Sequence, residues 1–247
     1  MKNLGHKNEH DFVNALNGKK VCELDFLLQE LVLFLFPSVK YNSVVYCYKN
    51  VEYEKGDICI KVGYRVKYIS IKMGHKNSVH CESIKKFTKF LESLNISSST
   101  INEILKYQYA DGTIDGTGNY RQSTAEYKQT NFDSIQKINK EINNSEVLKE
   151  SVNRFIIQGT QGHTHKVDLL VYGNPNDFFF ITPKEIHNYI QSKKDVDSSA
   201  IHFSCLTFQP LSRVLDYNEK MEYMRNWIQI KWYNLEDNII EIMNQRL

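Results

Sequence analysis

GDICIKVGYRVKYISIKMG, residues 56–74, is the stretch that decides how this chain folds. Apolar and polar side chains alternate with a period of two on both sides of Gly63-Tyr64, which indicates two β-strands joined by a tight turn. Glycine at the first central position suits a two-residue turn of type II′. The stretch therefore predicts a β-hairpin in which Val62 pairs with Arg65.

This register predicts a cluster of polar side chains. With Val62 opposite Arg65, Asp57 lies opposite Ser70. Side chains alternate between the faces of a sheet, so Asp57, Ser70 and Lys72 share one face. The other face is covered by isoleucines, namely Ile58, Ile60, Ile69 and Ile71. A three-residue loop would shift the register and break the cluster. We therefore expect a carboxylate beside a lysine that lies two positions further along the partner strand.

The arrangement resembles the PD-(D/E)xK nuclease family, which includes many type II restriction endonucleases. In that family an acidic residue begins one strand, and an acidic-x-Lys triplet lies on the next. Here Gly56-Asp57 stands for the first element and Ser70-Ile71-Lys72 for the second. The resemblance covers roughly residues 5–95. It has one departure, because Ser70 occupies the place where the family usually has Asp or Glu.

The resemblance implies Mg²⁺-dependent hydrolysis of double-stranded DNA, with Mn²⁺ as a substitute metal. Asp57 would bind the metal, Ser70 would orient the attacking water, and Lys72 would stabilise charge on the phosphate or help to deprotonate the water. Serine brings no negative charge, so a second carboxylate must come from elsewhere. Glu9 is the candidate, because it precedes Phe12 by one helical turn and nucleases of this family often place a Glu on the first helix.

The wider pattern predicts a mixed α/β chain, with a central mixed sheet flanked by helices in a restriction-endonuclease-like core. We expect one nuclease domain over residues 1–247. Its core would comprise about residues 5–95 and strands within 154–182, with the 109–123 loop and residues 200–247 as elaborations. Helices are expected at residues 8–17, 20–36, 78–94 and 131–153, after Pro183 and from Leu235. Strands are expected at 43–49, 57–74, 154–158, 167–172, 178–182 and 227–232.

Composition leaves the partner open. The chain has 247 residues, 41% of them hydrophobic, and a net charge of +2, which excludes a histone-like polycation but not a local basic face. Five cysteines without paired spacing indicate reduced thiols, and the longest apolar run is too short to cross a bilayer. We expect a cytoplasmic protein without membrane contact. Cutting both strands of a duplex calls for two active sites, so we also expect a homodimer.

Other residues offer weaker candidates. Thr113 and Arg121 in the glycine-bearing loop, together with Lys76 and His165, suit contacts to DNA. His163 and His165 share a strand face and could instead bind zinc, which makes a zinc-dependent hydrolase an alternative. A non-catalytic DNA-binding protein with a decayed nuclease fold is the other alternative, because of Ser70. Near the hairpin, His80 is expected on the buried face of a helix, and Glu82 is expected to point into solvent.

Overall fold

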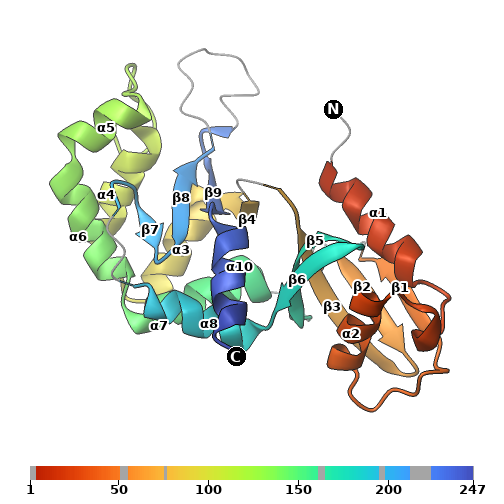
Figure 1. The fold of residues 1–247 in the computed structure, drawn as a ribbon. Helices are drawn as coiled ribbons and strands as arrows, with labels where there is room; N and C mark the ends of the chain where they lie inside the picture. The colour runs from red at the N-terminus through yellow and green to blue at the C-terminus, as the bar shows by residue number, and fades with distance from the viewer. Residues whose placement is uncertain are drawn as a thin grey trace. The chain divides into compact units, whose positions relative to one another are not determined.

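The computed structural model describes residues 4–50, 55–74, 77–160, 165–194, 198–211 and 224–246. The chain forms two compact units (Figure 1). The first unit comprises residues 1–77, 153–188 and 234–247, and the second comprises residues 78–152 and 189–233. The assignment of residues 1–247 to one nuclease domain stays a prediction.

The first unit is built on a five-stranded sheet with the order β1-β2-β3-β5-β6. Strands β3 and β5 run parallel, and the other neighbours are antiparallel. The predicted mixed sheet flanked by helices is therefore confirmed. The strands are β1 (Val45–Lys49), β2 (Ile58–Val62), β3 (Arg65–Lys72), β5 (Leu169–Asn174) and β6 (Asp177–Ile181).

Two helices cover one face of this sheet, as Figure 1 shows: α1 (Leu4–Leu16) and α2 (Phe26–Leu35), with a short 3-10 turn, η1 (Val21–Glu23), between them. Helix α1 contacts β1, β3 and β5, and its Phe12 packs edge-on against Phe178 with ring centroids 5.5 Å apart. The predicted isoleucines of the hairpin lie in the same core. At the other side of the sheet, α10 (Leu235–Asn244) contacts β6.

The hairpin has the predicted register. Val62 pairs with Arg65 and Ile58 with Ile69, so Asp57 and Ser70 follow as neighbours on the opposite face. Gly63 has a φ of +61°, the left-handed value that the first central position of a type II′ turn requires. Gly56 also lacks room for a side chain, because a Cβ there would lie 3.0 Å from the Tyr68 Cβ.

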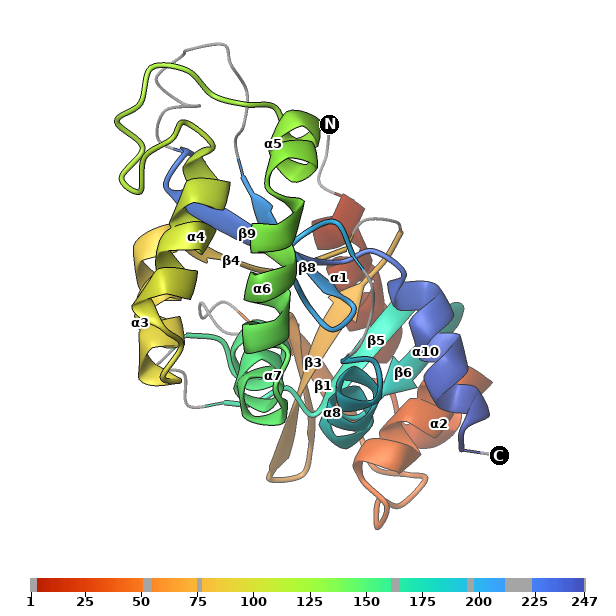
Figure 2. The ribbon, with the colours of Figure 1, turned by 90° about the vertical axis from the view of Figure 1, so that its left-hand side faces the viewer.

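The second unit contains a four-stranded sheet of order β4-β9-β8-β7, in which β9 is the predicted strand Trp227–Trp232. Helix α4 contacts both α3 and α6 beside this sheet (Figure 2). The other strands are β4 (Asn77–Ser83), β7 (His202–Phe203) and β8 (Leu206–Pro210). The helices are α3 (Ile84–Ser93), α4 (Ser98–Tyr109), α5 (Thr124–Thr130), α6 (Phe132–Ile142) and α7 (Ser145–Val152), and α8 (Pro183–Ser192) runs from the first unit into the second.

The helix predicted at residues 78–94 is wrong in its first half. Residues 77–83 form strand β4, and the helix begins only at Ile84, where the Ser83 side chain accepts a hydrogen bond from the Lys86 amide. His80 is buried as expected, but on a strand. Glu82 was expected in solvent, yet it is 3% exposed and lies 2.9 Å from His80 Nε2. Its burial beside a hydrogen-bonding partner overrides the usual preference of Glu for water.

Three further predictions needed correction. The helix at 20–36 is interrupted at Asp25, whose extended backbone precedes α2. The helix at 131–153 is two helices, because the Asn144 side chain accepts hydrogen bonds from the Glu146 and Val147 amides and so starts α7. The predicted strand at 154–158 is instead part of a π-helical turn, η2 (Asn153–Ile157), which continues α7. Among the described residues, no helix is long and apolar enough for a membrane span.

Replacing Phe12 with Ala should destabilise the first unit strongly. Phe12 is 1% exposed and packs on Phe178, so the substitution leaves a cavity in the core. We expect the free energy of unfolding to fall by about 3–5 kcal/mol in urea denaturation followed by circular dichroism. Phe26→Ala is the matched control, because Phe26 is 73% exposed, and it should cost less than about 0.5 kcal/mol. Equal losses in the two variants would contradict the packing described.

Candidate active site

Three donors converge on one carboxylate oxygen of Asp57. Its Oδ2 accepts hydrogen bonds from the Ser70 hydroxyl at 3.0 Å, the Ile71 amide at 2.6 Å and the Lys72 ammonium at 3.3 Å. All three donors come from successive residues of β3. The structure thus brings Asp57, Ser70 and Lys72 together as the hairpin predicts, and the carboxylate is fixed in one orientation.

The backbone ladder places this carboxylate. The Asp57 amide donates to the Ile69 carbonyl at 2.8 Å, and the Asp57 carbonyl accepts from the Asn50 amide at 3.0 Å. Asp57 is therefore held between β1 and β3 just before β2 begins. Its neighbour Ile58 points into the core, so alternation turns Asp57 to the opposite face. Ser70 is 4% exposed, whereas the Asp57 and Lys72 side chains are 26% and 20% exposed and can meet a ligand.

Two groups of the cluster keep bonding capacity. No described residue donates to the second carboxylate oxygen, Asp57 Oδ1. Lys72 uses one hydrogen on Asp57 Oδ2 and another on the Ile71 carbonyl at 3.1 Å, so the third remains for a ligand. Mg²⁺ takes oxygen ligands, keeps several waters and needs only one or two carboxylates when a phosphate also binds it. Asp57 Oδ1 fits such a cation if a phosphate oxygen and waters complete the ligand set, and the Ser70 hydroxyl lies beside the same carboxylate.

Glu9 lies on the other side of the sheet. It belongs to α1, which packs on the isoleucine face. Its Oε2 lies 2.6 Å from Lys49 Nζ and 3.2 Å from His6 Nδ1. Within the described ranges, no hydrogen bond or ion pair joins Glu9 to Asp57, and no three His, Cys, Asp or Glu side chains form a metal-binding group. The assignment of Glu9 as the second metal ligand stays a prediction.

Tyr172 is a neighbour of the cluster that sequence reasoning missed. It pairs with Lys72 across the parallel strands β3 and β5, and therefore lies on the same face. Its hydroxyl lies 2.8 Å from Glu236 Oε2 and 3.2 Å from the Gly74 carbonyl. Burial and the hydrogen bond to Glu236 raise the pKa of Tyr172 to about 12, which keeps the phenol neutral as a donor. The alternation in LLVYGN could have indicated its face but not its partner strand.

The candidate DNA contacts lie in different surroundings. Thr113 donates its hydroxyl to Asp111 at 2.7 Å, and Arg121 is 6% exposed, so both residues take part in the internal structure of the second unit. His165 stacks on Tyr68 in the first unit, with ring centroids 4.3 Å apart. Lys76 and the zinc candidate His163 lie outside the described residues. Their roles in binding stay predictions.

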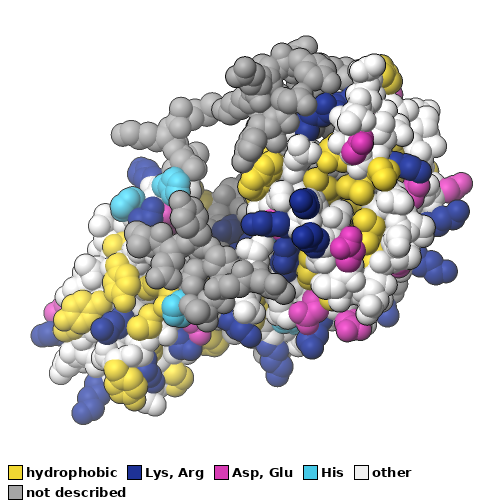
Figure 3. All heavy atoms as spheres, turned by 180° about the vertical axis from the view of Figure 1, so that it is seen from behind, with side chains coloured by type: hydrophobic (Ala, Val, Ile, Leu, Met, Phe, Trp, Pro, Cys, Tyr) yellow, Lys and Arg dark blue, Asp and Glu magenta, His cyan; other side chains and the backbone are white. Residues whose placement is uncertain are grey.

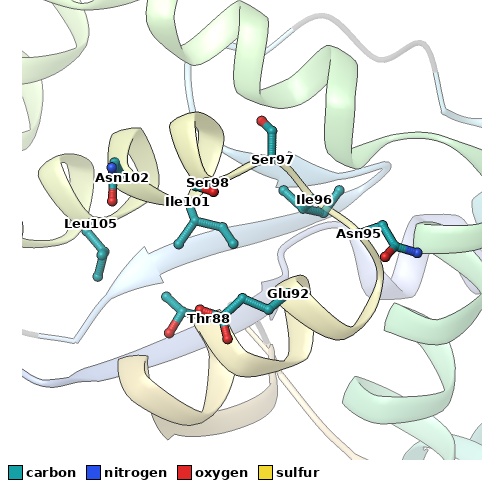
Figure 4. Close-up of a pocket in the computed structure, with 9 residues that line it drawn as sticks. All are labelled: Thr88, Glu92, Asn95, Ile96, Ser97, Ser98, Ile101, Asn102 and Leu105. Atoms are coloured by element: carbon teal, nitrogen blue, oxygen red, sulfur yellow. The ribbon is translucent and has the colours of Figure 1, made fainter.

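The second unit holds a pocket of about 480 Å³ between α3 and α4 (Figure 4). Most of its lining is polar and uncharged. Glu92 is the one ionisable side chain among the lining residues, so the pocket offers neither a paired acid and base nor a set of metal ligands.

Comparison with solved structures relates this chain to a DNA endonuclease. The structure is similar to that of the restriction endonuclease MspI in complex with its cognate DNA, with a TM-score of 0.60 and 11% sequence identity over 92% of this chain and 88% of that chain. No known protein family matches the sequence, and no curated protein matches it. The likeness shows that this chain has a restriction-endonuclease-like fold.

Replacing Ser70 with Asp should couple stability to a divalent metal. The new carboxylate would be buried next to Asp57, and the repulsion between like charges should lower the melting temperature without metal. Mn²⁺ should then raise the melting temperature of this variant more than that of the wild type, as thermal denaturation can measure. Ser70→Ala is the control, because it removes the hydroxyl without adding charge. A Ser70→Asp protein that shows no metal-dependent gain would show that position 70 takes no part in binding a divalent metal.

Proposed function

We propose that this protein is a metal-dependent DNA endonuclease that hydrolyses phosphodiester bonds in double-stranded DNA, in the role of a type II restriction endonuclease. The observation that carries the proposal is the carboxylate of Asp57, held by Ser70 and Lys72 on the hairpin. The fold it shares with an endonuclease solved on its cognate DNA supports the same reading. The restriction role further implies a cytoplasmic homodimer, since two sites are needed to cut two strands.

Each side chain has a role that its bonds allow. The free hydrogen of Lys72 can donate to a phosphate oxygen and stabilise the charge that develops there. Ser70 donates to Asp57 and keeps lone pairs that can accept from a water, which orients the water for attack. Asp57 would hold Mg²⁺ through Oδ1, and the bound metal would polarise the phosphate as a Lewis acid. The Ile71 amide holds the carboxylate in place while these groups act.

The charges of the cluster predict that the metal binds with the DNA. Asp57 and Lys72 form an ion pair, so together they offer a cation little net attraction. The phosphate of bound DNA would add the missing negative charge beside Asp57 Oδ1. Affinity for metal and affinity for DNA must then rise together, because coupling between two ligands is reciprocal.

We expect Asp57→Asn and Lys72→Ala each to abolish cleavage of plasmid DNA with Mg²⁺ or Mn²⁺, a loss of at least about 100-fold. Removal of the Lys72 charge deletes the phosphate contact, and the Asn side chain cannot serve as an anionic ligand. Asp177→Asn on β6 is the matched control and should cleave like the wild type. Retained cleavage in either site variant would refute the assignment.

DNA binding by the wild type without any cleavage would support a decayed nuclease, and tightly bound zinc would support a zinc hydrolase.

Mn²⁺ should bind at least about tenfold more tightly in the presence of DNA that carries phosphorothioates resistant to cleavage. The reason is the charge balance at Asp57 and Lys72. Isothermal titration with Mn²⁺, with and without this DNA, measures the difference, and Asp57→Asn should abolish it. Equal affinities with and without DNA would show that the protein alone completes the metal site.

A further inference from the structure

The face of the sheet that carries Asp57 continues across β1 and β2 as an exposed aromatic surface. Tyr46 and Tyr48 of β1 are 51% and 45% exposed, and they lie opposite Lys61 and Cys59 of β2. Cys59 in turn lies opposite Tyr68 of β3. We call this surface the tyrosine face and define it as Tyr46, Tyr48, Lys61 and Tyr68. Figure 3, which colours Tyr with the hydrophobic residues, shows such side chains with Lys and Arg among them on the first unit.

The tyrosine face begins next to the candidate active site. The row Tyr48–Cys59–Tyr68 follows directly after the row of Asp57 and Ser70, and residues two apart in a strand are separated by about 7 Å. The Tyr68 ring stacks on His165, with 24° between the ring planes. Tyr48 and Tyr68 flank Cys59, which is only 4% exposed on this face. Rings therefore stand within one or two nucleotides of the place where the scissile phosphate would bind.

The charge of this face suits a nucleic acid. In the described parts of β1, β2 and β3, the face carries Lys61 and Lys72, and it carries no carboxylate apart from Asp57. Basic side chains between aromatic rings are the arrangement with which proteins follow a single strand, because the cations meet phosphates and the rings stack on bases. Asp57 at the end of the row is the group assigned to catalysis.

A second copy of the chain cannot use this strand to extend the sheet. Strand β1 is at the sheet edge, but the chain closes its outer side: the Val45 amide donates to the Lys19 carbonyl, and the Gly18 amide donates to the Val45 carbonyl, both at 2.8 Å. The Cys47 amide donates to the Asn17 side chain at 3.0 Å. These backbone groups are no longer open to another strand, so edge pairing does not account for the exposed tyrosines.

We propose that the tyrosine face binds a single strand of DNA beside the scissile phosphate, with unpaired bases stacked on Tyr46 and Tyr48. In an intact duplex the faces of the bases are covered by their stacked neighbours, so only bases separated from their complement can use these rings. The proposal rests on the proposed nuclease function and narrows its substrate to DNA that is opened next to the cut. Lys61 lies opposite Tyr46, one row further from the site than Tyr48, where it can contact a phosphate of the bound strand.

The test measures the anisotropy of fluorescein-labelled oligothymidylate bound to the protein in EDTA. Tyr46→Ala and Tyr48→Ala should each weaken binding about tenfold, whereas Tyr48→Phe keeps the ring and should bind like the wild type. Tyr64→Ala is the matched control, because Tyr64 is 91% exposed at the hairpin turn away from the face, and its affinity should change less than about twofold. Circular dichroism confirms the fold of each variant.

Three results would overturn the proposal. The first is unchanged oligothymidylate affinity in Tyr48→Ala. The second is an equal loss of affinity for a fully paired duplex of the same length, which would show that unpaired bases are not the ligand. The third is a wild-type dimer in sedimentation that Tyr48→Ala converts to a monomer, which would make a second copy the occupant. The assay contains no metal, so its result does not depend on cleavage. If the protein never cleaves DNA but Tyr48→Ala still weakens binding of oligothymidylate, the proposed nuclease function is refuted and the inference about the tyrosine face stands.

Discussion

The hydrogen bonds that gather on Asp57 Oδ2 hold the candidate site together. They join the residue before β2 to the end of β3, and among the described residues they leave the other oxygen of this partly exposed carboxylate without a donor. A buried serine hydroxyl and a backbone amide are both satisfied by this one acceptor, so the bonds stabilise the hairpin as well as orienting the group. The side chain of Ser70 thus helps to hold the carboxylate of Asp57 in place.

The two faces of the sheet divide the work of the first unit. One face is apolar and buries the side chains of α1 and α2. The opposite face carries Asp57 and Lys72 together with the residues of the tyrosine face. Because side chains alternate strictly between the two faces, a residue can move from the apolar face to the opposite face only if the register of its strand changes. This division also explains why Glu9, on the helix that covers the apolar face, has Lys49 as its ion-pair partner.

The hairpin could be predicted from the sequence because its register depends on local chemistry, namely a glycine at the turn and two alternating strands. The pairing of β3 with β5 could not be predicted, since neither strand contains a local signal for a partner strand about a hundred positions away. Tyr172 was missed for the same reason. Residues 77–83 and 154–158 were assigned to the wrong elements because the spacing of their apolar residues fits more than one period. Capping by Ser83 and continuation of α7 into η2 decide between these periods in the structure.

The parallel pair β3–β5 also has a consequence for folding. Between these strands the chain leaves the first unit and builds residues 78–152 of the second. During synthesis at about 5–20 residues per second, the hairpin emerges many seconds before the strand that completes its sheet. Long-range pairing of this kind is slow to form, so the edge of β3 stays unpaired on the ribosome until β5 has been made. The hairpin of β2 and β3 is thus among the first elements made and among the last to be fully enclosed.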